Sequence, residues 1–210
     1  MAFLTASERR YLESLQKRIP TPVHYRTKEG HKTFSPAQSW ERVNNMEYPQ
    51  LYTVFPWGVH HIDAPELDIA RNTWYYGADV PAQKGYKSGE QSAVFCARLG
   101  LRQEAADFTI KKMKDSGRRF PTWWGPGHDW VPDHNWGGCG MIGLQEMVMQ
   151  CYGDKIYIGA GLPDDWDVDF KLHAPQETVV EGCIRRGKVV RLDVYPENRM
   201  KDIVVWLGKD

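Results

Sequence analysis

A chain of 210 residues with 27 basic and 27 acidic side chains has no formal net charge, and its length allows one or two domains with a buried core. The neutral balance without a basic patch argues against a nucleic-acid partner. No apolar run approaches the roughly 20 residues that span a bilayer, so no membrane partner is expected either.

The N-terminal half begins with a predicted helix over 5–18. Thr5 and Glu8 have the spacing of a capping box, and an apolar stripe follows at helical intervals. Prolines just after residue 18 end the helix. The polar stretch 21–40, punctuated by Gly and Pro, is interpreted as a loop.

The middle of the chain predicts paired helices. Helices are expected over 64–76, 89–99 and 102–115, with Gly100 and Gly117 at the ends of the last two. A helix, a tight turn and a return helix make an αα-hairpin, the unit from which helical barrels are built. The sequence therefore predicts helical packing for this part of the chain.

A Gly-, Pro- and Trp-rich segment, 118–140, leads from these helices into a fifth one predicted over 138–152. Aromatic faces stack on the C–H faces of sugars, so the segment is interpreted as part of a binding cleft. The alternative is that its aromatic side chains pack loops onto helices. Four of the nine tryptophans lie here: Trp123, Trp124, Trp130 and Trp136.

After residue 154 the pattern changes to short, alternating, β-branched runs, with a hairpin signal at 185–188. A helical part, 1–153, followed by a β-sheet part, 154–210, predicts an α+β fold with segregated elements. The expected strands lie within 155–160, 167–174, 178–187, 188–196 and 202–208.

Titratable groups gather in the Trp-rich segment, as His128, Asp129, Asp133, His134 and Asn135. Hydrolysis of a glycosidic bond requires one carboxyl group to protonate the leaving oxygen and another to activate water. Two alternatives remain open. Asp133 or Asn135 could cap the fifth helix, and the imidazoles and carboxylates could bind a metal ion, although no standard motif such as HExxH is present.

The four cysteines, by contrast, give no sign of a metal centre. They form no CxxC pair, and no histidine stands beside them at zinc-ligand spacing. We interpret them as buried thiols that act as small apolar side chains, and expect no cofactor and no resident metal. These cysteines are Cys96, Cys139, Cys151 and Cys183.

A second polar cluster precedes the aromatic run LYTVFPWGVHH and contains Asn44, Asn45, Glu47, Tyr48 and Gln50. Polar side chains ahead of such a run can point into a cleft, and a solvated loop is the equally simple alternative. Glu47 and Tyr48 are therefore candidates for substrate contact.

Four motifs in order resemble glycoside hydrolase family ninety-five, the α-L-fucosidases and α-L-galactosidases, over about residues 44–166. The sequence QLYTVFPWG at 50–58 is similar to the family's His-Leu-Tyr-Gly-Leu-Phe-Pro-Gly segment. DHNWG at 133–137 stands where the family has Asp-Gly-Asn-Phe-Gly, and QEMVMQ at 145–150 where it has Glu-Met-Leu-Leu-Gln. A short strand at 156–158 and a Leu-Pro turn at 162–163 complete the likeness.

The resemblance implies a partial α/α toroid of helical hairpins followed by a small antiparallel β-sandwich. It assigns Asp133 as the base of an inverting hydrolase and gives Trp136 the place of a Phe that shapes the sugar subsite. Glu47 and Tyr48 stand where the family has a His/Arg-rich substrate-contacting motif, so the resemblance does not extend to fucose specificity. The family's general acid lies upstream of the region that matches, and nothing in 1–43 corresponds to it.

The expectation is therefore the C-terminal portion of an enzyme on oligo- or polysaccharides, weak or inactive alone. Its partners would be a carbohydrate and either a second copy or the upstream part of the barrel. The N-terminus has no signal-peptide pattern, whereas intact relatives are expected to be periplasmic or secreted. The alternatives are a non-catalytic carbohydrate-binding module and a structural or interaction fragment.

Overall fold

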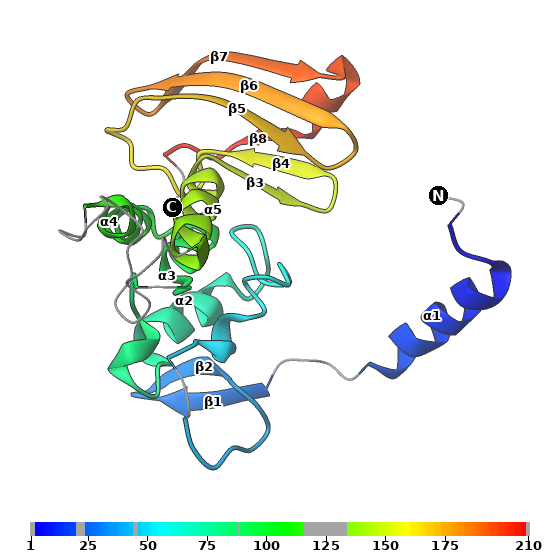
Figure 1. Ribbon diagram of the computed structural model, residues 1–210, viewed down its shortest axis with the longest axis vertical. Helices are drawn as coiled ribbons and strands as arrows, with labels where there is room; N and C mark the ends of the chain where they lie inside the picture. Colours follow the sequence, from blue (N-terminus) through cyan, green and yellow to red (C-terminus); the bar gives the residue numbers. More distant parts are fainter. Residues whose placement is uncertain (1–2, 20–23, 44–45, 88, 116–133, 209–210) are drawn as a thin grey trace.

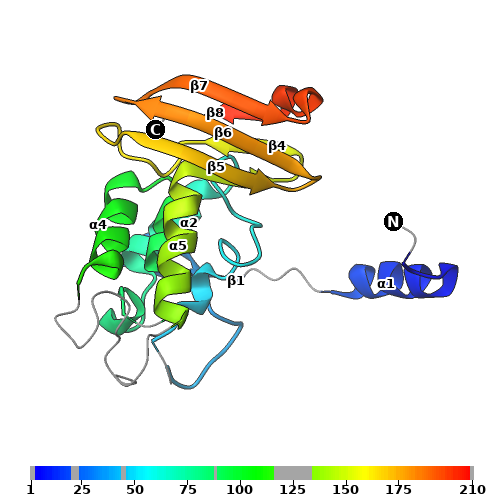
Figure 2. The same cartoon turned by 45° about the horizontal axis from the view of Figure 1, so that its top comes forward.

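The computed structural model describes residues 3–19, 24–43, 46–87, 89–115 and 134–208 (Figure 1). It has mixed α and β content, as the sequence predicts, with helices in the first two thirds of the chain and most strands in the last third. Figure 2 shows the sheets of the C-terminal region at one end of the helices.

Helix α1, Ala6–Arg18, forms where the capping signals predict it. The Thr5 hydroxyl accepts a hydrogen bond from the backbone N–H of Glu8, and the Glu8 carboxylate accepts one from the backbone N–H of Thr5 at 2.7 Å. None of its residues is buried, and both views show it apart from the other elements (Figures 1 and 2). Local signals therefore account for this helix without tertiary packing.

The predicted loop at 21–40 is wrong over 24–35, because strands β1, His24–Lys28, and β2, His31–Ser35, form an antiparallel hairpin there. Its two-residue turn places both Glu29 and Gly30 at positive φ, which matches the twist of the strands. Phe34 is buried and its backbone N–H donates to the Thr73 hydroxyl at 2.8 Å, so packing on a helix stabilises the hairpin.

The helical body consists of α2, Leu67–Tyr76, α3, Ser92–Arg98, α4, Arg102–Met113, and α5, His134–Val148. The expected hairpin between the third and fourth helices is confirmed, with Gly100 at φ +69 in the turn. The helices begin or end a few residues from the predicted boundaries. Side chains from several of them share one apolar core, which includes Trp74, Phe95, Leu99 and Met147.

The fifth helix does not continue to residue 152 as predicted. It ends at Val148, and the chain passes directly into strand β3, Met149–Tyr152, which pairs antiparallel with β4, Lys155–Ile158. Gly153, at φ +56, lies in the turn of this hairpin instead of ending the helix. The strand partner at 155–158 thus overrides the helical spacing of 149–152.

Two three-stranded sheets form the C-terminal end of the structure. The first has the order β3-β4-β8, in which β8, Ile203–Val205, is parallel to β4 and shorter than predicted. The second is the antiparallel sheet β5-β6-β7, with bounds Val168–Ala174, Thr178–Arg185 and Lys188–Tyr195. The strand pairing is therefore mixed, not wholly antiparallel. An apolar cluster from both sheets joins them, and short 3-10 turns occur at Pro49–Leu51, Pro81–Gln83 and Glu197–Asp202.

Two glycines of α5 test how closely this helix packs on α3. A Cβ added at Gly143 would lie 2.9 Å from the Ala93 Cβ, whereas one at Gly138 would meet nothing within 4 Å. We expect Gly143→Ala to destabilise the protein by about 1–3 kcal/mol through overpacking. Gly138→Ala should stabilise it by about 0.5–1 kcal/mol through helix propensity. Urea unfolding measures both, and equal effects of the two substitutions would contradict the packing described.

Candidate functional site

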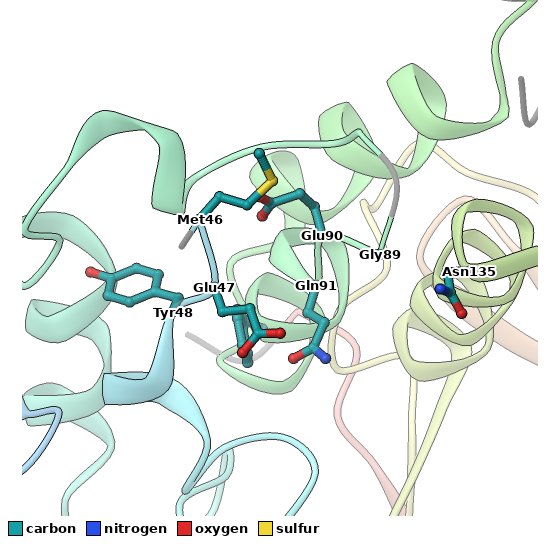
Figure 3. Close-up of a pocket in the computed structure, with 8 residues that line it drawn as sticks. Met46, Glu47, Tyr48, Gly89, Glu90, Gln91 and Asn135 are labelled. Atoms are coloured by element: carbon teal, nitrogen blue, oxygen red, sulfur yellow. The ribbon is translucent and has the colours of Figure 1, made fainter. Parts of the chain in front are cut away.

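Three separate segments of the chain meet around one cavity of about 260 Å³. Figure 3 shows Glu47 and Glu90 on neighbouring segments, with Asn135 on the first turn of α5 across from them. The cavity thus draws together residues far apart in sequence. Its lining residues are Met46, Glu47, Tyr48, Gly89, Glu90, Gln91, Phe95 and Asn135.

Tyr48 and Gln83 fix the segment that carries Glu47. Tyr48 is 2% exposed, its hydroxyl donates to the Thr73 carbonyl of α2, and Figure 3 shows its ring directed away from Asn135. The Gln83 amide donates to the backbone carbonyl of Glu47 at 2.9 Å. The side chain of Tyr48, an expected substrate contact, therefore serves as an anchor, while the neighbouring Glu47 side chain remains exposed.

The carboxyl group of Glu90 has the most unusual acidity in the cavity. Burial raises its pKa from an ordinary 4.5 to about 7, against the lowering effect of the Lys112 ammonium and with a further raising effect of the Glu47 carboxylate. Lys112 is 1% exposed and donates to the Tyr86 carbonyl at 2.8 Å. Glu90 consequently exchanges its proton near neutral pH, as a general acid or base does.

The Glu47 carboxylate has a different environment. It is exposed to solvent, and it accepts a hydrogen bond from the Tyr52 hydroxyl. Burial and this hydrogen bond raise the pKa of Tyr52, which therefore remains a proton donor to the carboxylate. One cavity thus holds two carboxyl groups in unlike surroundings, an arrangement that assigns acid and base roles in many active sites.

Replacing Glu90 with glutamine should make the protein more stable at high pH. The folded protein binds the Glu90 proton more tightly than the unfolded chain, so stability falls as pH rises from 4.5 to about 7. Because the Glu90 side chain is partly exposed, the free energy of unfolding lost over this pH range is about 1–2 kcal/mol. We expect E90Q to exceed the wild type by this amount at pH 8 and to match it near pH 4.

Urea unfolding at several pH values measures this difference. Glu41→Gln, which replaces an exposed carboxyl group outside the cavity, is the control and should show no comparable dependence on pH. A constant difference between E90Q and the wild type from pH 4 to pH 8 would contradict the raised pKa of Glu90.

The first turn of α5 contributes Asn135 to the cavity and directs Trp136 elsewhere. Asn135 is exposed, whereas Trp136 is 4% exposed. The indole N–H of Trp136 donates to the Lys112 carbonyl at 2.7 Å, and its ring meets Tyr86 edge-on. Trp136, expected to shape a sugar subsite, therefore packs in the interior, where it supports the element that carries Lys112.

Several predicted site residues fall outside the described part of the chain. His134 begins α5, but its side chain is not described. The structure brings together Glu47, Tyr48 and Asn135 from the predicted set. The predictions that fall on 116–133 concern Trp123, Trp124, His128, Asp129, Trp130 and Asp133.

Glu90 is the functional candidate that the sequence analysis did not identify. Its only local signal is a carboxylate two residues before the apolar helix SAVFCA, with glycine at position 89. Its acidity depends first on burial, then on Lys112 and Glu47, which come from other parts of the chain. Sequence spacing alone does not reveal such a group.

Within the described ranges, no group of three or more His, Cys, Asp or Glu side chains could hold a metal ion. None of the helices in those ranges is long and apolar enough to cross a membrane. All four cysteines are free thiols, and burial raises the pKa of Cys96 far above its ordinary value. The two carboxyl groups that line the cavity, Glu47 and Glu90, can take part in acid–base chemistry.

No protein-family model matches the chain, and no curated protein matches it at a significant level. The support for a function therefore comes from the chemistry of the cavity and from the sequence motifs around it.

Proposed function

We propose that the chain is the C-terminal portion of a glycoside hydrolase that acts on oligo- or polysaccharides by inversion. The observation that carries the proposal is the cavity in which Glu90, half-buried and with a pKa raised to about 7, lies near the exposed Glu47 carboxylate. Glycosidic hydrolysis requires a carboxyl group that is still protonated near neutral pH and a second group that activates water.

Glu90 is the proposed general acid. This assignment departs from the resemblance, which places the family's general acid upstream of the region that matches. Asp133 is the proposed base, as that resemblance implies. Asn135, two residues further along the chain, lines the cavity and can orient the attacking water through its amide. Glu47 helps Glu90 to keep its proton until the leaving oxygen takes it.

The proposal also concerns the architecture. The α3–α4 hairpin and α5 are taken as part of an α/α toroid, and the two C-terminal sheets as the small β-sandwich that follows it. The other helical hairpins would come from the upstream part of the enzyme or from a second copy. A carbohydrate-binding module without catalysis is the second candidate, since a cavity with polar and aromatic walls can bind a sugar without cleaving it.

Asp133→Asn separates the two candidates. In the longest natural polypeptide that carries this sequence, the substitution should abolish hydrolysis and leave sugar affinity within about threefold, because the amide keeps the shape but cannot accept the proton. The measurements are hydrolysis of aryl L-fucosides and L-galactosides and calorimetric binding of the free sugars. Hydrolysis that survives in D133N would show that the base is another residue. A wild type that binds sugars without cleaving any would favour the binding module.

A further inference from the structure

A second cavity, of about 220 Å³, adjoins the proposed active site. Glu47 lines both cavities, so the two adjoin at this residue. The second cavity is built from the segment after β2, the 3-10 turn Pro49–Leu51 and the segment that follows α2. Its walls include Trp40, Arg42, Gln50 and Asp79.

Trp40 gives this cavity an aromatic surface in a fixed position. The Arg26 guanidinium lies 5.0 Å from the centre of the indole ring, and Arg26 itself is held by Asp79 at 2.8 Å and by the Gly77 carbonyl. Trp40 nevertheless keeps 41% of its surface exposed. An exposed aromatic face held in this way is suited to stacking on the C–H face of a pyranose ring.

The polar wall of the cavity suits hydroxyl groups. Gln50 is 1% exposed, and its amide donates to the Gly77 carbonyl at 3.2 Å and to Asp79 at 2.9 Å. Its Oε1 accepts no hydrogen bond from any described residue. A ligand hydroxyl, which can both donate and accept, could satisfy this acceptor after a small shift of the side chain.

The charges around the cavity are nearly balanced. Asp79 is paired with Arg26 at 2.8 Å and Lys28 at 3.4 Å, and Arg42 lies in the same wall as Glu47. Neither sign is in clear excess, so the cavity favours an uncharged, hydroxyl-rich ligand over a strongly anionic or cationic one.

We infer that the second cavity is a saccharide subsite with Trp40 as its stacking platform. The substrate then spans Glu47 with one ring in each cavity, and is a neutral oligosaccharide of at least two units. This inference rests on the proposed function, because it assigns the neighbouring cavity to the sugar whose bond is cleaved.

Calorimetric titration with L-fucose, L-galactose, 2′-fucosyllactose and a fucosylated xyloglucan nonasaccharide tests the subsite. Trp40→Ala should weaken the binding of an oligosaccharide about tenfold, because one stacking contact is lost. The affinity for monosaccharides should remain unchanged. Trp40→Phe, which keeps an aromatic face, should lose much less. Trp57→Ala is the matched control, since Trp57 is 71% exposed and lines neither cavity.

The outcomes separate the subsite from the proposed function. If the oligosaccharides bind and W40A behaves like W57A, the subsite is overturned while the proposed function stands. If no sugar of the panel binds to the wild type, the subsite is overturned together with L-fucosyl and L-galactosyl substrates for the proposed hydrolase. Thermal melting checks the fold of each variant, and Trp40→Leu, which keeps apolar bulk without an aromatic face, replaces W40A if that variant melts early.

Discussion

Replacing Glu90 with glutamine is expected to lower kcat toward phenyl glycosides by roughly 100- to 10,000-fold, the usual contribution of a general acid. Glutamine keeps the size of the side chain but has no acidic proton for the leaving oxygen. Dinitrophenyl glycosides leave without protonation, so E90Q should retain most of its activity toward them. The measurement uses both leaving groups on L-fucose and L-galactose, in the longest natural polypeptide that carries the chain.

Glu47→Gln is a second variant for this experiment. It removes a carboxylate that raises the pKa of Glu90, so that pKa should fall from about 7 toward its ordinary value. Since the acid works in its protonated form, the alkaline limb of the pH–kcat profile should move to lower pH while turnover at acidic pH persists. Equal losses of E90Q activity on phenyl and dinitrophenyl substrates would show that Glu90 does not donate the proton.

Local signals in the sequence predict the structure correctly wherever a short segment determines its own conformation. The capping pair Thr5 and Glu8 predicts α1, and Gly100 predicts the turn between α3 and α4. The turn at Arg186 and Gly187, both at positive φ, joins β6 and β7 where the hairpin signal lies. In each case the hydrogen bonds or the backbone geometry involve residues within a few positions of one another.

The predictions that failed concern segments whose structure depends on packing against distant parts of the chain. The stretch at 21–40 is too polar to suggest strands, and the hairpin there depends on burial of Phe34 against α2. Residues 149–152 have helical spacing, but pairing with Lys155–Ile158 makes them a strand. The free energy that decides both segments comes from partners that the local pattern does not contain.

The candidate site likewise contains residues that the sequence indicates and a residue that only the structure identifies. Residue types indicated Glu47 and Asn135 because polar side chains stood beside aromatic runs. Glu90 emerged only from the structure, since its acidity arises from burial and from charges elsewhere in the chain. Trp136 shows the reverse case, in which a candidate binding aromatic is used for interior packing. The role of Asp133 stays a prediction.

Arg98 and Glu146 form a largely buried ion pair between α3 and α5 whose loss should destabilise the protein strongly. Their closest atoms lie 2.7 Å apart, and the side chains are only 13% and 17% exposed. Arg98 also donates to the Val54 carbonyl at 3.0 Å and lies over the Phe55 ring. It therefore joins α3 and α5 to the segment that contains these two residues. Glu146→Ala leaves a buried guanidinium without its carboxylate and should cost about 3–5 kcal/mol.

The exposed pair of Arg185 and Asp169 is the matched control, because its 2.6 Å separation is similar while the side chains are 38% and 68% exposed. Asp169→Ala should cost much less than Glu146→Ala, since water screens that pair. Urea unfolding of both variants measures the contrast. Replacing Arg98 and Glu146 together with methionine should cost less than Glu146→Ala alone, because neither charge is then left buried. A cost for Glu146→Ala no larger than that for Asp169→Ala would contradict the proposed effect of burial on the Arg98–Glu146 pair.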